Sequence, residues 1–345
     1  MVSALVLGAA LGRGSVPFAT ALQANLNQVW GSQDVNYAPV ISCSRTDFEL
    51  HKDSSELLAA QGISSSDLTF LDDCDFKALS SNDQLALVLT DHNQLTFSHL
   101  GGRVVGIVDH HTETGAHDLP AACRLVEPVG SCCTLIARLL EKDPDLLGQQ
   151  DVSRLLASTI IVDTANFDAA SRRFTDEDCH AASTLGKDLD PSVVLRDMVA
   201  WRSDLSGISN HGRLRKDYKE YTDSGTHYGI ATVPISLTEW LASSPELVSD
   251  LASFTLQQSL ASLMVLLPFS SPSGTQRHVL VYTPPQSPLS HSRLVAFLQT
   301  PPIGLEPLET EATRGEEQLS SFRQLDLSLT RKHIQPLFAK WLETH

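Results

Sequence analysis

The sequence predicts an α/β protein in which a doubly wound, mainly parallel sheet is followed by a smaller α/β domain. Three apolar runs carry this prediction: residues 85–90, 104–108 and 159–162. Each run is continuous rather than alternating, as is typical of parallel strands that are buried on both faces. Stretches with helical patterning separate the runs, and this alternation of strand and helix favours a doubly wound domain.

The first domain contains further elements that the sequence pattern predicts. They are helices over residues 2–11, 18–30, 54–60, 134–141 and 176–185, and short strands over residues 37–41 and 68–71. Ser131 is placed to cap the helix over 134–141. Gly186 to Pro191 has the turn chemistry of a linker, so we expect the first domain to span residues 1–188 and the second to span 192–345.

The second domain is predicted to mix helices and strands. Its expected elements are helices over 193–201 and 211–221, strands over 227–235, 260–268 and 278–282, and a last helix from Thr330 through Trp341. Residues 283–317 are rich in Pro, Ser and Glu, so they are expected to form a loop. A chain of 345 residues is long enough to give each of two domains its own core.

Composition narrows the classes of function. The formal net charge is −16, with 41 acidic against 25 basic residues, which disfavours nucleic acid as the main partner. None of the six cysteines forms a C-x-x-C pair, so we expect a reduced, cytoplasmic protein. Residues 2–11 are apolar but no charge precedes them, which disfavours a signal peptide. No run reaches the roughly 18 apolar residues of a membrane span, so no membrane is expected as a partner.

All three apolar runs end on side chains that can bind a metal. The first ends at Asp91, the second at Asp109-His110-His111 and the third at Asp163. In an open parallel sheet the carboxyl ends of the strands share one rim, so these five side chains should gather there. Carboxylates and imidazoles suit Mn²⁺ or Mg²⁺, and imidazole tilts the choice toward Mn²⁺. A polar loop after the second strand and a helix cap at the third acid are the alternative interpretations.

These motifs resemble those of the DHH phosphoesterase superfamily, and within it the prune-type and yeast-type exopolyphosphatases, which are related to the family II inorganic pyrophosphatases. Asp91 matches the second motif, Asp109-His110-His111 the third and Asp163 the fourth. Residues 130–135 resemble the Gly-Ser-rich helix start that follows the third motif, and residues 214–219 and 330–333 resemble two basic motifs of a DHHA2-type domain. The resemblance implies a DHH domain followed by a DHHA2 domain, with the active site in the cleft between them.

The resemblance also implies roles for the residues of the rim. Asp91 would bridge two metal ions, and His110 and Asp163 would be ligands of the better-preserved ion. Asp109 would hold an imidazole in its tautomer, and His111 would hydrogen-bond the phosphate or protonate the leaving group. The family uses two Mn²⁺ or Mg²⁺ ions.

Substrate binding is implied for Arg215, Lys216, Arg331 and Lys332. For the first two, a solvated helix face explains the charges almost as well. Arg331 and Lys332 open a helix, where cations oppose the macrodipole, so a bound anion explains them better. His333 replaces the usual third base of the motif, which predicts a weaker hold on polyphosphate near neutral pH.

The family's first motif, a His followed by Asp-x-Asp-Ser, is absent. Residues 1–33 contain no Asp, Glu or His, and the first acid is Asp34. We expect the chain to begin just after this motif, whether through a start site placed too late, a shortened isoform or a protein that lacks these ligands. One or both metal sites should then be weakened, with low turnover.

The sequence therefore predicts a hydrolase that resembles exopolyphosphatases and inorganic pyrophosphatases. Metal-activated water would cleave the phosphoanhydride bonds of short-chain polyphosphate or pyrophosphate. Two alternatives stay open: cyclic-nucleotide phosphodiesterase activity, or a catalytically impaired regulatory or scaffold protein with protein partners. Gly101-Gly102 lies in the wrong place for the glycine-rich motif of the nuclease branch, which argues against that branch.

Overall fold

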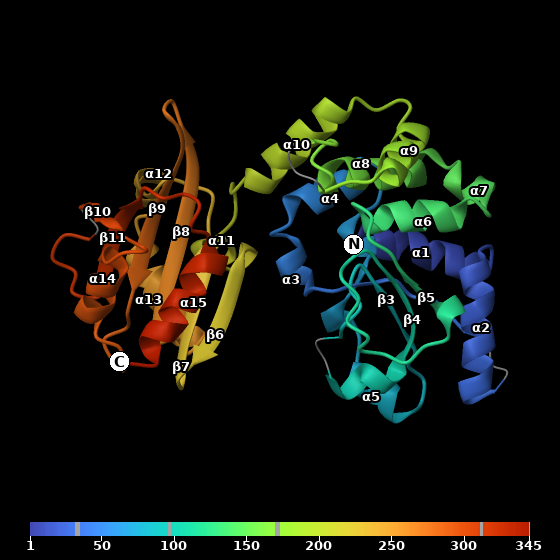
Figure 1. Cartoon of the computed structure of the whole chain (residues 1–345), viewed down its shortest axis with the longest axis horizontal. Coiled ribbons are helices and arrows are strands. Elements are labelled where there is room, and N and C mark those ends of the chain that lie inside the picture. The colour runs from blue at the N-terminus through green and yellow to red at the C-terminus, as the bar shows by residue number, and fades with distance from the viewer. Residues whose placement is uncertain (32–34, 96–97, 170–172, 311–312, 345) are drawn as a thin grey trace. The chain divides into compact units, whose positions relative to one another are not determined.

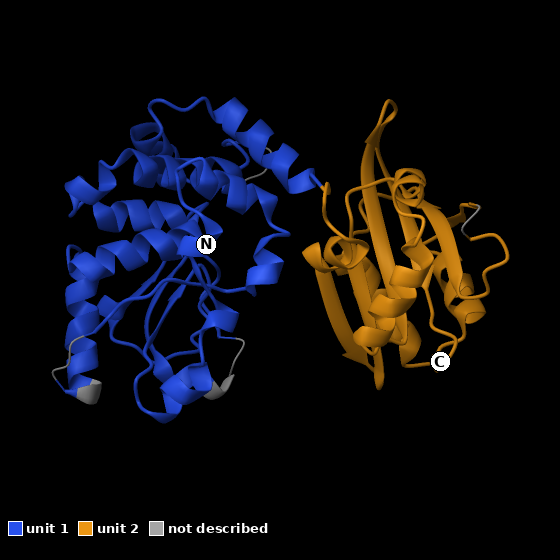
Figure 2. Ribbon diagram, turned by 180° about the vertical axis from the view of Figure 1, so that it is seen from behind, with its two compact units in different colours: residues 1–204 blue, residues 205–345 orange. Residues whose placement is uncertain are grey.

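The chain forms two compact units, each with its own core. The computed structural model describes residues 1–31, 35–95, 98–169, 173–310 and 313–344. Unit 1 comprises Met1–Asp204 and unit 2 comprises Leu205–His345 (Figure 2).

Parallel strands form the sheets of unit 1. Strands β3 (Leu87–Thr90), β4 (Val104–Asp109) and β5 (Arg124–Val126) make a three-stranded parallel sheet with β4 in its centre (Figure 1). Strands β1 (Val40–Ile41) and β2 (Thr69–Phe70) form a separate parallel pair. Every residue of β4 is buried, so its continuous apolar run reflects a strand that is covered on both faces. The predicted α/β class is confirmed, and two of the three apolar runs form the parallel strands β3 and β4.

Helices cover the central strand closely. Helices α2 (Pro17–Trp30) and α6 (Cys132–Leu140) both contact β4, and α1 (Val2–Arg13) packs on α6. A Cβ at Gly106 would lie 2.5 Å from Cδ2 of Leu22 in α2, so a larger residue here would require the Leu22 side chain to shift. The predicted cap of α6 is present, because the Ser131 side chain accepts a hydrogen bond from the backbone N–H of Cys133.

The remaining helices of unit 1 surround this centre. They are α3 (Arg45–Phe48), α4 (Lys52–Ala59), α5 (Phe76–Ser81), α7 (Pro144–Leu147), α8 (Gln150–Asp163), α9 (Asp176–Leu185) and α10 (Pro191–Ser203). Short 3₁₀ turns cover Ser65–Asp67, Leu71–Asp73, Ser98–Arg103 and Ala121–Cys123.

The predicted strand over residues 159–162 is wrong, because these residues form the last turn of α8. The buried side chains of this helix recur at intervals of three and four residues: Val152, Leu155, Leu156, Ile160 and Ile161. A run of four apolar residues by itself does not distinguish a buried strand from a buried helix segment. Asp163 therefore lies at the carboxyl end of a helix, not of a strand.

Helix α10 belongs to unit 1, although the sequence suggested that it opens the second domain. It contacts α4 and α8, and two ion pairs fasten it to α4. Lys52 Nζ lies 2.6 Å from Asp204 Oδ2, and Arg202 Nε lies 2.7 Å from Asp53 Oδ2. The boundary between the units falls after Asp204, and the predicted linker connects α9 to α10 inside unit 1.

Unit 2 is built on a six-stranded sheet with helices on both faces. The strands, in spatial order, are β10 (Glu306–Pro307), β11 (Leu319–Gln324), β9 (Gly274–Tyr282), β8 (Ser262–Ser271), β7 (Thr226–Thr232) and β6 (Tyr218–Asp223). Only β7 and β8 pair in parallel. The predicted strands over 227–235, 260–268 and 278–282 correspond to β7, β8 and β9.

Alternate side chains of β8 enter two different cores. Leu263 and Val265 pack with α11 (Asn210–Lys216), α12 (Leu237–Ser243) and α13 (Leu247–Gln257). Met264 and Leu266 pack with α14 (His291–Gln299) and α15 (Arg331–Leu342) on the other face. This period of two residues explains why the strand reads as an uninterrupted apolar run.

Two predicted elements of unit 2 need correction. The helix expected over 211–221 ends at Lys216, and β6 follows it. This strand is paired on one side only and is mostly polar, so it lacks the apolar run that identified the other strands. The expected loop over 283–317 contains α14 and β10, while its residues 311 and 312 lie outside the described residues. Helices α12 and α13 and strand β11 were not predicted.

No single helix in the described part of the chain is long and apolar enough to cross a membrane. Helix α1 and residues 17–28 of α2 reach that length and composition only when taken together, and a bend of 72° separates them.

Candidate metal centre

The candidate metal centre begins where the two neighbouring strands β3 and β4 end. Thr90 pairs with Val108 in the parallel ladder, and the backbone N–H of Asp91 donates to the Val108 carbonyl over 2.9 Å. The ends of β3 and β4 therefore bring Asp91 beside Asp109. Asp91 has a φ of 67°, a left-handed conformation that costs a residue with a Cβ roughly 1–2 kcal/mol. Such strain is concentrated at functional sites, so it supports a functional role for Asp91.

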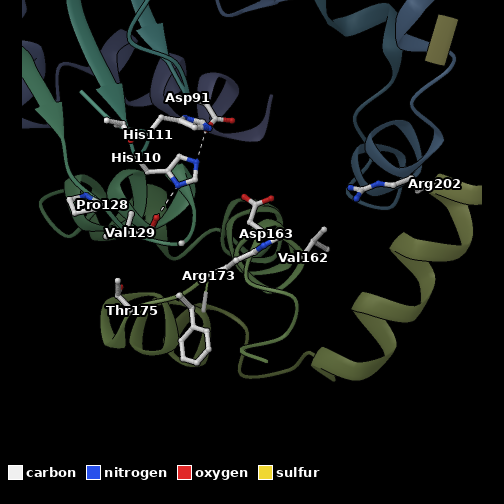
Figure 3. A pocket seen from close by; sticks show the side chains of 13 residues that line it. Asp91, His110, His111, Pro128, Val129, Val162, Asp163, Arg173, Thr175 and Arg202 are labelled. Atoms are coloured by element: carbon white, nitrogen blue, oxygen red, sulfur yellow. Dashed lines mark hydrogen bonds and ion pairs between the residues drawn. The ribbon is translucent and has the colours of Figure 1, made fainter. Parts of the chain in front are cut away.

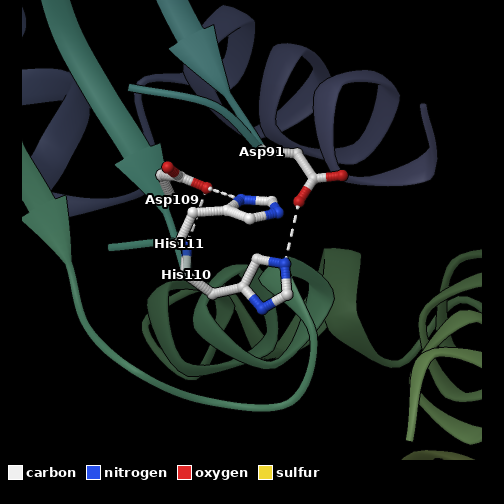
Figure 4. A group of neighbouring side chains, drawn as sticks. All are labelled: Asp91, Asp109, His110 and His111. Atoms are coloured by element: carbon white, nitrogen blue, oxygen red, sulfur yellow. Dashed lines mark hydrogen bonds and ion pairs between the residues drawn. The ribbon is translucent and has the colours of Figure 1, made fainter. Parts of the chain in front are cut away.

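Four side chains meet at this point (Figure 4). Asp91, Asp109, His110 and His111 each offer a ligand atom within 4.8 Å of the others. His110 Nε2 lies 3.2 Å from Asp91 Oδ1, and His111 Nδ1 lies 2.8 Å from Asp109 Oδ1. The centroids of the two imidazole rings are 4.4 Å apart, with the rings edge to face. The structure thus places together four of the five rim residues that the sequence singles out.

Asp109 is fully buried and is held by several hydrogen bonds. Its Oδ1 accepts from the backbone N–H of His110 over 2.8 Å, and its Oδ2 accepts from Asn93 Nδ2 over 2.6 Å. Burial disfavours the charged form, but the hydrogen bonds from His111 and Asn93 outweigh burial and lower the pKa of Asp109. An anionic Asp109 fixes the proton of His111 on Nδ1, which leaves Nε2 for a ligand or substrate.

Asn93 is a further contributor to the site. It is buried, and its Oδ1 accepts from the Thr114 hydroxyl over 2.6 Å. Its amide therefore connects the loop after β3 to the Asp109 carboxylate. No local pattern distinguishes such a residue from an ordinary loop Asn, because its partners come from another segment of the chain.

His110 is oriented by a backbone carbonyl. Its Nδ1 lies 2.9 Å from the Val129 carbonyl oxygen, which places a proton on Nδ1 and turns Nε2 toward Asp91. The hydrogen bond to Asp91 raises the pKa of His110 to about 9, although burial acts in the opposite direction. A metal ion would compete for the same Nε2 atom, because an imidazole ligand binds through its unprotonated nitrogen.

Asp163 lies apart from the four-residue group but faces the same cavity. Its Oδ2 accepts a hydrogen bond from the Ser131 hydroxyl over 2.6 Å. Burial is the main cause that raises the pKa of the Asp163 carboxyl, and the negative charge of Asp91 raises it further. As the last residue of α8 it also faces the negative end of the helix dipole. A carboxylate that lines this cavity next to the charge of Asp91 fits a nearby cation.

Asp178 holds the backbone of the loop before α6, and the sequence analysis did not identify this residue. This fully buried carboxylate accepts hydrogen bonds from the backbone N–H groups of Gly130, Ser131 and Thr175, at 2.8, 3.2 and 2.7 Å, and from the Thr134 hydroxyl. Burial opposes its ionisation, but these bonds outweigh burial and lower the pKa of Asp178. A readable signal was present, because Thr175-Asp176-Glu177-Asp178 has the spacing of a capping box.

A cavity of about 710 Å³ opens over these residues (Figure 3). Its volume lies within the roughly 300–1,000 Å³ that is typical of small-molecule sites. It is lined by carboxylates, imidazoles and two arginines, which include Asp91, His110, His111, Asp163, Arg173 and Arg202.

The comparisons with known proteins agree with the motifs. Residues 196–341 match the model of the DHHA2 domain. Exopolyphosphatase PRUNE1 of Bos taurus is 29% identical over 342 residues, which cover 96% of this chain and 73% of that protein. These matches agree with the resemblance to the DHHA2-containing, prune-type branch of the DHH superfamily. The human exopolyphosphatase PRUNE1 is 28% identical over 320 residues, covering 90% of this chain and 69% of that protein.

A further relative of this chain is named a probable manganese-dependent inorganic pyrophosphatase, from Bacillus licheniformis. It is 29% identical over 188 residues, which cover 52% of this chain and 59% of that protein.

The bases predicted to bind substrate lie in unit 2. Arg331 Nη2 lies 2.8 Å from Asp217 Oδ1, and its Nη1 donates to the Asp217 carbonyl over 3.1 Å. Since Asp217 directly follows Arg215 and Lys216, the structure brings the two basic segments together. Lys332 is exposed beside Arg331. That these bases face the metal centre stays a prediction.

His333 has a structural partner in unit 2. Its Nδ1 accepts from the backbone N–H of Thr330 over 3.2 Å, which makes it the third helical residue of a capping box at the start of α15. The residue that replaces the third base of the motif therefore has a structural role.

Proposed function

We propose that this chain is a metal-dependent phosphohydrolase that cleaves phosphoanhydride bonds of short-chain polyphosphate or pyrophosphate. The observation that carries the proposal is the group formed by Asp91, Asp109, His110 and His111 at the ends of two adjacent parallel strands. Relatives that are named exopolyphosphatase and manganese-dependent inorganic pyrophosphatase support it.

The donor set fits a divalent cation. Asp91, His110 and Asp163 offer carboxylate oxygens and an imidazole nitrogen, which suit a divalent cation. Desolvation and then the charge of Asp91 raise the pKa of the Asp163 carboxyl, and a cation would act in the opposite direction. We favour Mn²⁺ over Mg²⁺ because the donor set includes imidazole, and the resemblance implies a second ion, which Asp91 would also help to hold. When bound, such ions acidify water and neutralise charge on phosphoryl oxygens.

The chain's own residues would orient the substrate and move a proton. Asp109 holds the His111 ring so that Nε2 can hydrogen-bond a phosphoryl oxygen or protonate the leaving phosphate. The His111 side chain is exposed to the cavity, so a substrate can reach it. Arg215, Lys216, Arg331 and Lys332 of unit 2 would bind the phosphate chain.

The test is phosphate release from tripolyphosphate and pyrophosphate by the purified chain with Mn²⁺. Asp91→Asn should abolish release, while Asp151→Asn, which removes an exposed acid on α8, should not. Release that needs Mn²⁺ and is lost only in Asp91→Asn supports the proposal. Cleavage of a cyclic nucleotide in place of both substrates would contradict it.

A second candidate follows from one sequence observation. Residues 1–33 hold no Asp, Glu or His, so α1 and α2 add no carboxylate or imidazole ligand to the site. A protein that binds polyphosphate without cleaving it, with a regulatory role, would use the same cavity. Calorimetric binding of tripolyphosphate without phosphate release would favour this candidate.

We place the protein in the cytoplasm as part of the proposal. All six cysteines are free thiols, which is the state expected in a reducing compartment. Fractionation of cells that express the tagged chain tests this placement.

A further inference from the structure

The cavity of unit 1 contains an arginine that the proposed reaction has not yet used. Arg202 lies on α10 and lines the cavity together with Asp163 and His111. Figure 3 shows its guanidinium pointing into the cavity from the side opposite the Asp91–His110 pair, with Asp163 between them. Arg173 adds a second cation to the lining. The anionic centre of the cavity is thus bordered by arginine.

A buried carboxylate fixes the orientation of Arg202. Its Nε donates to Asp53 Oδ2 over 2.7 Å, and the other carboxylate oxygen of Asp53 accepts from the backbone N–H of Ser54 over 3.0 Å. The Asp53 side chain is only 9% exposed, whereas that of Arg202 is 59% exposed. Asp53 is therefore a fixed anchor, and the arginine extends from it.

Most donors of Arg202 remain available to a ligand. A guanidinium carries five N–H groups in a planar fork. Among the described residues, only the Nε group has a protein partner, so the four N–H groups on the two Nη atoms face the cavity without one. This fork matches the geometry of two phosphoryl oxygens, which a lysine could not reproduce.

A purely structural role explains Arg202 less well. The ion pair does fasten α10 to α4, but Lys52 and Asp204 already join the same two helices over 2.6 Å. A fastening role requires contact with α4 only, and it does not require that the guanidinium line the cavity.

We propose that Arg202 binds a phosphoryl group of linear polyphosphate other than the one being cleaved, and thereby favours chains of three or more phosphates over pyrophosphate. This inference rests on the proposed function. The candidate metal ligands hold the terminal phosphoryl group on one side of the cavity, so a longer chain extends toward Arg202 on the other side. Pyrophosphate, with a single further phosphoryl group, is too short to engage both.

Arg202→Gln tests the proposal in the full chain through the Michaelis constant for each substrate. We expect the KM for tripolyphosphate to rise at least about tenfold, since a charge-assisted hydrogen bond is lost, while kcat and the KM for pyrophosphate stay within about twofold. Arg202→Lys keeps the charge but not the fork, so its effect should be intermediate. Lys52→Gln, which breaks the other pair between α4 and α10, should leave both KM values unchanged.

Equal changes in KM for both substrates, or no change, would overturn the proposal, because a fastening role does not depend on chain length. Calorimetry separates this result from failure of the proposed function. Tripolyphosphate is titrated into Asp91→Asn and into Asp91→Asn combined with Arg202→Gln or with Arg202→Lys. If the native chain releases no phosphate, a tenfold weaker affinity in the Gln double variant still supports the role of Arg202. Equal affinity, or no binding to Asp91→Asn, refutes it.

Discussion

The two units hold an arginine against a carboxylate in opposite ways. In unit 1 the Asp53 side chain is 9% exposed and its partner Arg202 is 59% exposed. In unit 2 the Arg331 side chain is 21% exposed and its partner Asp217 is 49% exposed. In the first pair the carboxylate is buried and the guanidinium is exposed. In the second pair the guanidinium is the less exposed partner.

This difference indicates what each arginine can offer to a phosphate. Arg202 gives one N–H group to Asp53, while Arg331 gives two to Asp217, one to the side chain and one to the carbonyl. Arg331 therefore has fewer donors left, and part of its hydrogen bonding serves to join the two basic segments of unit 2. The chemical groups are likewise divided, with carboxylates and imidazoles in unit 1 and clustered bases in unit 2.

The largest expected effect is on kcat, and it distinguishes a catalytic role of unit 1 from a binding role of unit 2. Asp91→Asn should lower kcat for tripolyphosphate by a factor on the order of 10² to 10³ or more, because it removes charge that acts directly on the reacting groups. Arg331→Gln should raise KM about tenfold with little change in kcat. Steady-state phosphate release measures both. A loss of kcat in Arg331→Gln as large as that in Asp91→Asn would contradict this assignment of roles to the two units.

The next effect concerns the stability of unit 1. Asp178→Asn should lower the free energy of unfolding by about 2–4 kcal/mol, because several buried donors lose a charged acceptor. Urea denaturation measures this change. Asp176→Asn, an exposed neighbour on the same helix, is the control and should change stability by less than about 1 kcal/mol. Similar values for both variants would show that Asp178 is not the anchor.

Breaking each arginine–carboxylate pair should lower the free energy of unfolding by an amount that depends on how buried the carboxylate is. Asp53→Asn should destabilise the chain by about 1–3 kcal/mol, since the buried side of that pair is altered while the exposed arginine stays solvated. Asp217→Asn should cost less than about 1 kcal/mol, as for exposed pairs. The same urea experiment ranks them, and the reverse order would contradict the comparison.

The smallest effect is the pH dependence of the His110–Asp91 pair. The pKa of His110 is raised from 6.5 to about 9, so in EDTA the pair stabilises the fold fully below about pH 6.5 and loses this effect as pH rises through 9. The loss should be small because Asp91 is partly exposed. His110→Gln removes the dependence, so the difference in unfolding midpoint between native and variant protein should shrink from pH 6 to pH 10. A difference that grows with pH would contradict the assignment.

Local pattern was enough to predict the part of the site that follows strands. Asp91, Asp109, His110 and His111 come directly after apolar runs, and parallel strands bring such ends together. Asp163 reached the same cavity for a different reason, since a helix and not a strand delivers it.

The residues that the sequence did not reveal depend on contacts between distant segments. Asn93 is linked to Asp109, Asp178 to the loop before α6, and Asp53 to Arg202, a residue 149 positions further along the chain. The side chains of Asn93 and Asp53 look like those of any other polar residue until the partner is known, whereas Asp178 also fits the spacing of a capping box. The polar strand β6 was missed for a related reason, because its fold depends on pairing with β7 rather than on its own pattern.

The left-handed backbone at Asp91 has an evolutionary consequence. Glycine adopts a φ of 67° without strain, so Asp91→Gly would relax the chain at the position where it removes the carboxylate. At this residue, the stability of the fold and the function of the carboxylate therefore favour different side chains. Without selection for hydrolysis, this position would tend to change to a residue that makes the fold more stable. Retention of aspartate at position 91 therefore indicates that its carboxylate is in use.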